Sequence, residues 1–201
     1  MPETAAIIGA GPLGRWLALA AARSGFRVLL EDVMPANLHH AQELLRQQLG
    51  SAALPNVAFV STIEDAVRDA DLVIDCVPDE LESKLEILWL LDRMAPPRAV
   101  LATPTTHLSI ADLAHCTYRP GKCIAIAAEA SSLTGSAAAQ RAGETPEILL
   151  RTTTRTEPET IALLDRFWRQ LGFSPTFDLE PSGHQQVILL KNSLTQQDPG
   201  E

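Results

Sequence analysis

Three glycines at fixed spacing lie directly after a short apolar run near the start of the chain. Residues 9–14 read G-A-G-P-L-G after the run 5–8, and helical apolar spacing continues over residues 13–23. Glycines in such a turn allow a tight bend, a close approach of the backbone to phosphate, and close packing of helix on strand. The N-terminus of the helix then offers free N–H groups and a positive dipole end to an anion. The segment therefore predicts a phosphate-binding turn between a strand and a helix.

A carboxylate follows the second apolar run at the spacing of a dinucleotide site. Asp32 lies 23 residues after Gly9, beyond the run 27–30. A carboxylate about 20 residues after the glycines binds the adenosine ribose of NAD, and it would repel the 2′-phosphate of NADP. The pattern predicts NAD rather than NADP; the alternative interpretation is a glycine turn that holds no ligand. The residues expected at the phosphates and the ribose are Gly9, Gly11, Pro12, Leu13, Gly14 and Asp32.

From these residues onward the chain resembles the NAD-binding domain of the 3-hydroxyacyl-CoA dehydrogenases. Residues 70–81 read A-D-L-V-I-D-C-V-P-D-E-L, similar to the family's A-D-x-V-I-E-A-V-P-E-D-L. Residues 102–110 read A-T-P-T-T-H-L-S-I, similar to A-T-N-T-S-S-L-S-I. The resemblance implies an NAD-dependent oxidoreductase of fatty acid metabolism, with an acyl-CoA-type small molecule as substrate. It also implies further cofactor contacts at Val77, Pro78, Asp79, Lys84 and Thr103, although Asp79 and Lys84 would equally suit a solvated helix start.

The family's catalytic pair has no counterpart in this sequence. Oxidation of a 3-hydroxyl group needs a base for the hydroxyl proton, and in the family a histidine held by a glutamate fills that role. The histidine belongs to a G-x-H-F-F-N-P segment, which here reads A-I-A-A-E-A-S over residues 125–131 and places Ala127 at its position. The glutamate falls on Ala139 by counting forward, or on Leu149 by counting back from a later motif. None of these side chains can accept a proton.

Three polar residues are candidates for a relocated catalytic group: Glu147, Glu129 and His107. Glu147 lies two residues before Leu149 on an expected strand and therefore shares its face. Glu129 has the same relation to Ala127 if the sixth strand continues, and His107 belongs to the segment near the expected nicotinamide. A histidine and a carboxylate suffice for general base catalysis if they converge. The alternative is that all three are surface residues. No metal-ligand spacing is present, so no metal is expected.

Alternating apolar runs and helical patterns must position these residues. Strands are expected at residues 5–8, 27–30, 57–60, 72–77, 99–102, 122–128, 147–151 and 176–179. Helices are expected at 13–23, about 35–49, after 62, 80–94, after 109 and 156–172, while residues 131–142 are expected to be a surface segment, weakly helical at best. Thr62, Ser109 and Thr156 each precede an acidic residue by three positions, which is the spacing of a helix N-cap. The pattern predicts an α/β fold with a doubly wound, mostly parallel Rossmann-type sheet over residues 1–180, followed by a short C-terminal helix within 181–201.

Composition excludes several classes of partner. The chain has 201 residues, 46% of them hydrophobic and 20% charged, with a formal net charge of −9. That sign disfavours nucleic acid and anionic membrane surfaces. No apolar run approaches the roughly 20 residues of a membrane-spanning helix. The start of the chain lacks the basic region of a signal peptide, and its three cysteines show no C-x-x-C spacing, which predicts a cytoplasmic protein.

Three function classes remain open. The first is an oxidoreductase completed by relocated residues or by a partner subunit, the second a non-catalytic NAD-binding protein, and the third an interaction module. Intact glycines with a lost catalytic pair favour an NAD-binding protein with weak or no dehydrogenase activity of its own. The family's C-terminal helical domain, which dimerises and closes over the acyl chain, has no counterpart in the 201 residues. The apolar residues at 187–190 and 194 therefore predict a homodimer or a heteromeric assembly that covers them.

Overall fold

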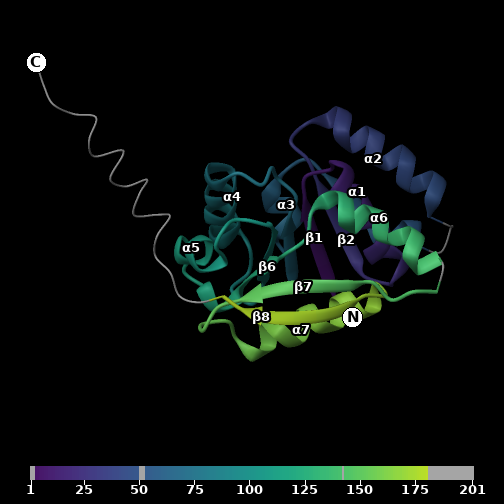
Figure 1. The fold of residues 1–201 in the computed structure, drawn as a ribbon. Helices are drawn as coiled ribbons and strands as arrows, with labels where there is room; N and C mark the ends of the chain where they lie inside the picture. Colours follow the sequence, from purple (N-terminus) through teal and green to yellow (C-terminus); the bar gives the residue numbers. More distant parts are fainter. Residues whose placement is uncertain (1–2, 50–52, 142, 181–201) are drawn as a thin grey trace, which may run out of the picture.

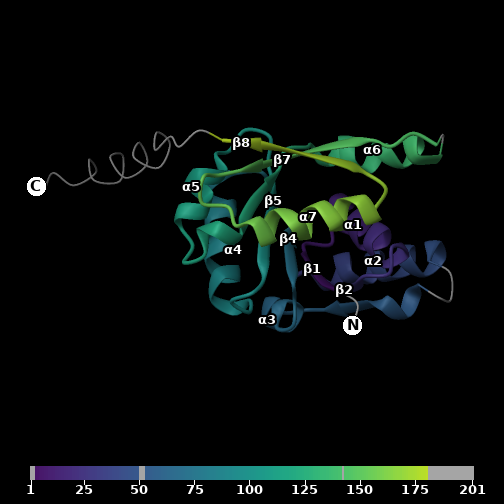
Figure 2. The ribbon, with the colours of Figure 1, turned by 90° about the horizontal axis from the view of Figure 1, so that it is seen from below.

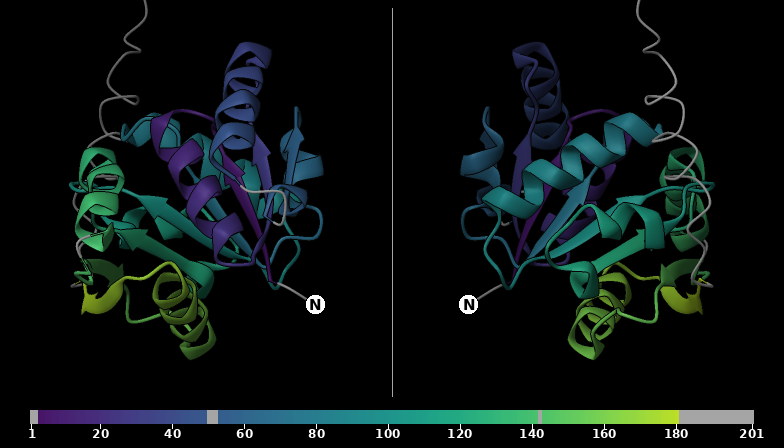
Figure 3. Two further views of the ribbon diagram at one scale, coloured as in Figure 1. Left: turned by 90° about the vertical axis from the view of Figure 1, so that its right-hand side faces the viewer. Right: turned by 90° about the vertical axis from the view of Figure 1, so that its left-hand side faces the viewer.

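Helices cover both faces of a single sheet in the computed structural model, which describes residues 3–49, 53–141 and 143–180 (Figures 1 and 3). The strands within these ranges are β1 (Thr4–Ile8), β2 (Arg27–Glu31), β3 (Val57–Val60), β4 (Leu72–Asp75), β5 (Val100–Pro104), β6 (Cys123–Ile126), β7 (Glu147–Thr152) and β8 (Ser174–Leu179). Their order is β3-β2-β1-β4-β5-β6-β7-β8. Only the pairing of β6 with β7 is antiparallel among these neighbours. The predicted doubly wound, mostly parallel fold is confirmed.

The helices follow the strands as the apolar spacing predicts. They are α1 (Pro12–Arg23), α2 (Pro35–Gln48), α3 (Ile63–Val67), α4 (Leu81–Met94), α5 (Ile110–His115), α6 (Ala130–Arg141) and α7 (Pro158–Gln170), with single 3₁₀ turns at Leu54–Asn56 and Pro120–Lys122. Two of the predicted N-caps are confirmed. The hydroxyl of Thr62 accepts a hydrogen bond from the Asp65 N–H at 3.2 Å, and that of Ser109 accepts one from the Asp112 N–H at 3.2 Å.

Two apolar layers sandwich the sheet because successive strand residues point to opposite faces. In β1, Ala5 and Ile7 belong to one core, whereas Ala6 and Ile8 belong to the other. The first core is closed by α1, α2, α6 and α7, and the second by α3, α4 and α5. The central strands are therefore buried on both faces, which explains their continuous apolar runs.

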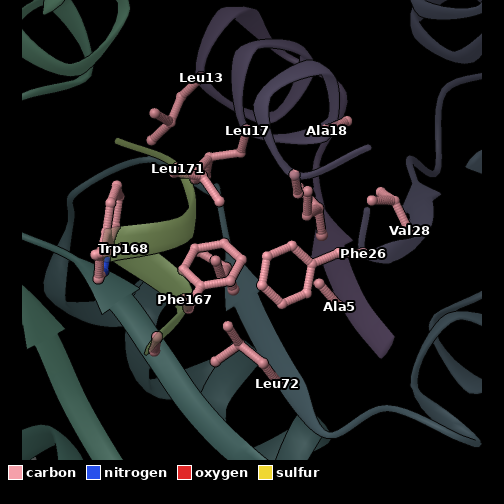
Figure 4. Close-up of a cluster of buried hydrophobic side chains, with 14 of the residues drawn as sticks. Ala5, Leu13, Leu17, Ala18, Phe26, Val28, Leu72, Phe167, Trp168 and Leu171 are labelled. Carbon is pink, nitrogen blue, oxygen red and sulfur yellow. The ribbon is translucent and has the colours of Figure 1, made fainter. Parts of the chain in front are cut away.

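Aromatic side chains join α7 to the N-terminal half of the fold. Phe167 and Leu171 pack beside Leu17 of α1 and Phe26 (Figure 4). The rings of Phe26 and Phe167 lie 5.0 Å apart between centroids. Figure 2 shows α7 beside β8, with which it is in contact. This packing attaches α7, which lies between β7 and β8 in the chain, to α1 and the N-terminal half of the fold.

Two local predictions were wrong. Residues 130–141 form the helix α6, because Leu133 is buried in the core beside α1 and tertiary packing compensates for the weak helical signal of its neighbours. Thr156 does not cap α7, since its hydroxyl accepts a hydrogen bond from the Thr153 N–H at 2.8 Å in the preceding turn. Glu157 occupies the N-cap position instead, without a side-chain cap.

Two strands end earlier than predicted. β4 stops at Asp75 rather than at residue 77, and β6 stops at Ile126 rather than at residue 128. In both places the chain leaves the sheet at its carboxyl edge and turns to line a cavity. The predicted terminal helix at 184–194 lies outside the described residues. Within the described ranges, no helix is long and apolar enough to cross a membrane, and no cluster of three or more potential metal-ligating side chains is found.

Candidate functional site

The turn between β1 and α1 has the geometry of a phosphate site. Gly9 has a φ of +103°, a left-handed conformation that glycine adopts without strain, and its N–H donates to the Glu31 carbonyl at 2.8 Å. The helix begins at Pro12, which has no N–H to leave unpaired. The N–H groups of Leu13 and Gly14 lack an intrahelical acceptor and point out of the end of α1. They are free to bind an anion.

The other two glycines differ in what surrounds them. A Cβ on Gly14 would lie 1.8 Å from the Gly9 carbonyl oxygen, so only glycine lets the helix approach the strand this closely. A Cβ on Gly11 would meet nothing within 4 Å. That open space is the cradle into which a pyrophosphate fits, and a side chain would fill it. The residues of the turn therefore fit a dinucleotide.

Asp32 has a structural role at the glycine turn. Its Oδ2 accepts a hydrogen bond from the Ala10 N–H at 2.8 Å, and its Oδ1 accepts one from the Met34 N–H at 2.7 Å. The carboxylate therefore braces the glycine turn from the neighbouring strand. The Asn37 amide donates to both oxygens at 3.2 and 3.1 Å. Asn37 is exposed, so ribose hydroxyls would compete with its amide for the carboxylate. No motif in the sequence points to this residue.

A cavity of about 390 Å³ opens on the other side of the glycine turn. It is lined by Gly11, Pro12, Leu13, Cys76, Val77, Pro78, Asp79, Pro104, Thr106, Ala128 and Glu129. The predicted contacts from the phosphate turn and from the loop after β4 therefore come together in one wall. Burial raises the pKa of Cys76, which keeps its thiol neutral.

Lys84 and Thr103 lie behind this wall rather than in it. Lys84 is fully buried, and its Nζ is 2.6 Å from the Asp75 Oδ1, whose side chain is also inaccessible. Burial raises the pKa of Asp75 above its ordinary value although the ammonium lies beside it. Thr103 is buried too, and its hydroxyl interacts with the Asp75 carboxylate, which lowers the pKa of that carboxyl group but by less than burial raises it. The Lys84–Asp75 pair joins the start of α4 to the end of β4, and so supports the loop that carries Asp79.

His107 lies at the edge of the cavity and contacts its wall. Its Nδ1 is 3.3 Å from the Asp79 Oδ2, and the same oxygen accepts the Thr106 N–H at 3.1 Å. The imidazole itself is mostly exposed, and it is not among the lining residues. The structure thus pairs this candidate with a carboxylate.

Ala127 and Leu149, two residues expected at the positions of the family's catalytic pair, lie side by side. The Ala127 N–H donates to the Leu149 carbonyl at 2.8 Å, which supports the count that places the glutamate position on Leu149. Leu149 is 39% exposed, a large apolar side chain on an open face of β7. Glu129 lines the cavity but follows the end of β6, so the expected face-sharing with Ala127 does not apply. Glu147 is exposed at the first residue of β7 and does not line the cavity.

Glu31, the residue before Asp32, is a buried carboxyl group that titrates near neutrality. It is 5% exposed, and burial together with the Asp32 charge raises its pKa from 4.5 to about 7. The folded state therefore holds a proton that the unfolded state releases at lower pH. The free energy of unfolding should fall as the pH rises from 4.5 to about 7, and the loss is complete above that window.

Glu31→Gln should remove this loss because the amide is neutral at every pH. At pH 8 we expect the variant to be more stable than the parent by about 1 to 3 kcal/mol, with little difference near pH 4.5. Urea unfolding at both pH values measures this. Glu86→Gln, at an exposed position of α4, is the control and should follow the parent. Parallel pH profiles for Glu31→Gln and the parent would contradict the prediction.

The fold and the site together define a dinucleotide-binding domain of the oxidoreductase type. Residues 4–127 match the family described as 3-hydroxyacyl-CoA dehydrogenase, NAD binding domain. The chain belongs to this family, and NAD is the cofactor of the matched domain. The predicted family and cofactor are confirmed.

Individual relatives cover the same part of the chain. A probable 3-hydroxybutyryl-CoA dehydrogenase of Bacillus subtilis (strain 168) is 31% identical over 131 residues, which are 59% of this chain and 45% of that protein. An L-carnitine dehydrogenase of Burkholderia mallei is 37% identical over 132 residues, 61% of this chain and 41% of the relative. The chain thus spans less than half the length of these relatives.

Solved structures extend the similarity beyond the matched domain. The 3-hydroxyacyl-CoA dehydrogenase of Archaeoglobus fulgidus superposes with a TM-score of 0.72 at 25% identity, covering 97% of this chain and 62% of that one. The (S)-3-hydroxybutyryl-CoA dehydrogenase of Ralstonia eutropha gives 0.77 at 21% identity over 94% of this chain, and shows the fold alone. The similarity therefore includes β7, α7 and β8.

Proposed function

We propose that this chain binds NAD through the glycine turn and Asp32, and that by itself it has weak or no 3-hydroxyacyl-CoA dehydrogenase activity. The single observation that carries the second half is the hydrogen bond from Ala127 to Leu149. This bond supports the proposal because it joins Ala127, at the expected base position, to Leu149, one of the two residues expected at the orienter position, and both side chains are apolar. NAD, when bound, supplies hydride acceptance at its nicotinamide ring, but a proton acceptor must come from the protein.

The cofactor contacts are part of this proposal. The turn offers N–H groups to the pyrophosphate, Asp32 accepts from the adenosine ribose, and Val77, Pro78 and Asp79 line the cavity that receives the other half. Lys84 and Thr103 act on that half through the loop and strand they support, since both are buried behind the wall. A carboxylate at Asp32 disfavours the 2′-phosphate of NADP.

A second candidate function is an active oxidoreductase with a relocated base. The observation that favours it is the 3.3 Å contact between His107 and Asp79 at the edge of the cavity.

We also propose a cytoplasmic location and a homodimeric or heteromeric assembly. The assembly is supported by the exposed apolar side chains of Leu149 in β7 and Leu179 in β8.

Calorimetry followed by a rate assay tests the proposal. We expect the chain to bind NAD more tightly than NADP, and to oxidise NADH with an acetoacetyl thioester about 10²- to 10⁴-fold more slowly than an enzyme with a positioned base. The absence of a binding heat with both NAD and NADP, or tighter binding of NADP, would contradict the proposal that the chain binds NAD. Turnover of about 1 to 10³ per second would contradict the catalytic half. If His107→Ala then abolished that turnover, the second candidate function would replace the first.

A further inference from the structure

The charges around the cavity decide which redox form of the cofactor binds better. NAD⁺ and NADH share the same adenosine, riboses and diphosphate, and they differ in the nicotinamide ring. The ring carries a positive charge in NAD⁺ and is neutral in NADH. A charged side chain beside the ring therefore changes the affinity for one form and leaves the other almost unaffected.

The topology places the nicotinamide half in the cavity. Strand order changes direction between β1 and β4, and a dinucleotide crosses the sheet at such a switch point, over the carboxyl ends of the strands. Asp32 at the end of β2 receives the adenosine half on one side of the glycine turn. The other half must then lie over the ends of β4, β5 and β6, and residues that follow or end these strands line the cavity.

The ionisable charges in the cavity wall are negative. Among its lining residues, Asp79 and Glu129 carry charge at neutral pH, and neither lysine nor arginine is present. The neighbouring ammonium of Lys84 is buried and 2.6 Å from Asp75, which neutralises it. His107 contacts Asp79 from the solvent side. The positively charged nicotinamide ring of NAD⁺ would therefore lie against a cavity wall that carries negative charge.

Glu129 and Ala128 are wall residues that stand where the family segment has aromatic residues, and of the two only Glu129 introduces a charge. It immediately precedes α6, whose N-terminal dipole end favours a negative charge. The Ser131 hydroxyl donates to its Oε2 at 3.1 Å and holds the carboxylate. The side chains of Pro104, Val77 and Ala128 on the same wall are apolar. Glu129 itself is exposed, so solvent screens part of its charge, while the apolar side chains of the wall limit that screening on the cavity side.

We propose that this site binds NAD⁺ more tightly than NADH, with Glu129 as the residue that determines the preference. The inference rests on the proposed NAD binding and adds the redox form that the site selects. A carboxylate in a solvated wall of the cavity that would receive the ring gives a preference of about 3- to 10-fold. Because tighter binding of the oxidised form lowers the reduction potential, each tenfold preference shifts the bound couple by about −30 mV.

Calorimetric titration with NAD⁺ and with NADH, on the parent and on Glu129→Gln, tests the proposal. The amide retains an oxygen for the Ser131 hydroxyl, so α6 should begin as before; an unchanged thermal midpoint checks this. We expect the parent to prefer NAD⁺, and Glu129→Gln to reduce the preference at least about threefold by weakening NAD⁺ while NADH binding is retained. Glu86→Gln removes the same charge at an exposed position of α4 and should keep the preference of the parent.

The outcomes separate this inference from the proposed function. Equal affinities for the two forms in the parent, or a preference for NADH, would overturn the inference and leave NAD binding intact. A preference that survives in Glu129→Gln would overturn the role of this residue. The absence of a binding heat with both NAD⁺ and NADH would refute the proposed function, and the inference with it.

Discussion

Lys84→Met should lower the free energy of unfolding by about 3 to 5 kcal/mol, the usual effect of removing one partner from a buried ion pair. Lys84 and Asp75 are both fully buried, with 2.6 Å between Nζ and Oδ1. The Thr103 hydroxyl and the Val77 N–H also interact with the Asp75 carboxylate, but neither carries a charge. Without the ammonium, the carboxylate would be a buried charge with no counter-charge, because methionine fills the volume but supplies no donor.

The double variant Asp75→Asn/Lys84→Met is the matched control. A neutral amide avoids the isolated charge, so we expect the double variant to recover a large part of the stability lost by the single one. Burial raises the pKa of Asp75, and loss of Lys84 raises it further. Lowering the pH then protonates the carboxyl group and should reduce the deficit of the single variant. Urea unfolding at two pH values measures both effects, and a single-variant loss below about 1 kcal/mol would contradict the assignment.

Gly14→Ala should destabilise the domain by about 2 to 4 kcal/mol, because the new methyl group would meet backbone rather than a mobile side chain. Its Cβ would lie 1.8 Å from the Gly9 carbonyl oxygen, so either α1 moves away from β1 or the phosphate turn changes shape. Alanine is the better helix former by up to about 1 kcal/mol, which is less than this cost. Both movements would also disturb the N–H groups that face the pyrophosphate.

Gly11→Ala provides the comparison within the same turn. Gly11 has a φ of −66°, which alanine adopts freely, and its Cβ would meet no atom within 4 Å. We expect its thermal midpoint to stay close to that of the parent while NAD binding weakens, since the methyl group occupies the space of the pyrophosphate. Thermal unfolding and calorimetry of both variants separate packing from ligand contact. Equal thermal midpoints for Gly14→Ala and the parent would show that the helix does not depend on this approach.

Most elements of the fold could be predicted from local signals. The apolar runs at β1, β2 and β4 and the glycine turn are contiguous in sequence, and their periodicity reports burial on both faces of a parallel sheet. The N-caps at Thr62 and Ser109 involve residues three positions apart. Local patterns failed in two places, once because of a competing turn and once because of a tertiary contact. Thr156 hydrogen-bonds to Thr153 instead of capping α7, and α6 is helical because Leu133 packs beside α1.

The sequence by itself determined the chemistry available at the site. The glycine turn with Asp32 predicts NAD, and the resemblance to the family implies that the residues at the base and glutamate positions cannot accept a proton. Tertiary structure alone decided how these residues are arranged. Pairing of β6 with β7 brings Leu149 beside Ala127. Lys84 is buried against Asp75 and does not line the cavity.

The same distinction holds for the polar candidates. Glu129, Glu147 and His107 are alike in sequence as polar residues of loops or strand ends, but only Glu129 lines the cavity, and His107 reaches it through Asp79. The register of β7 leaves Glu147 exposed on the sheet. Side-chain direction at a strand end depends on where the strand stops and on which segments pack against it. Those contacts join residues far apart along the chain, and so they follow from the folded structure rather than from local sequence patterns.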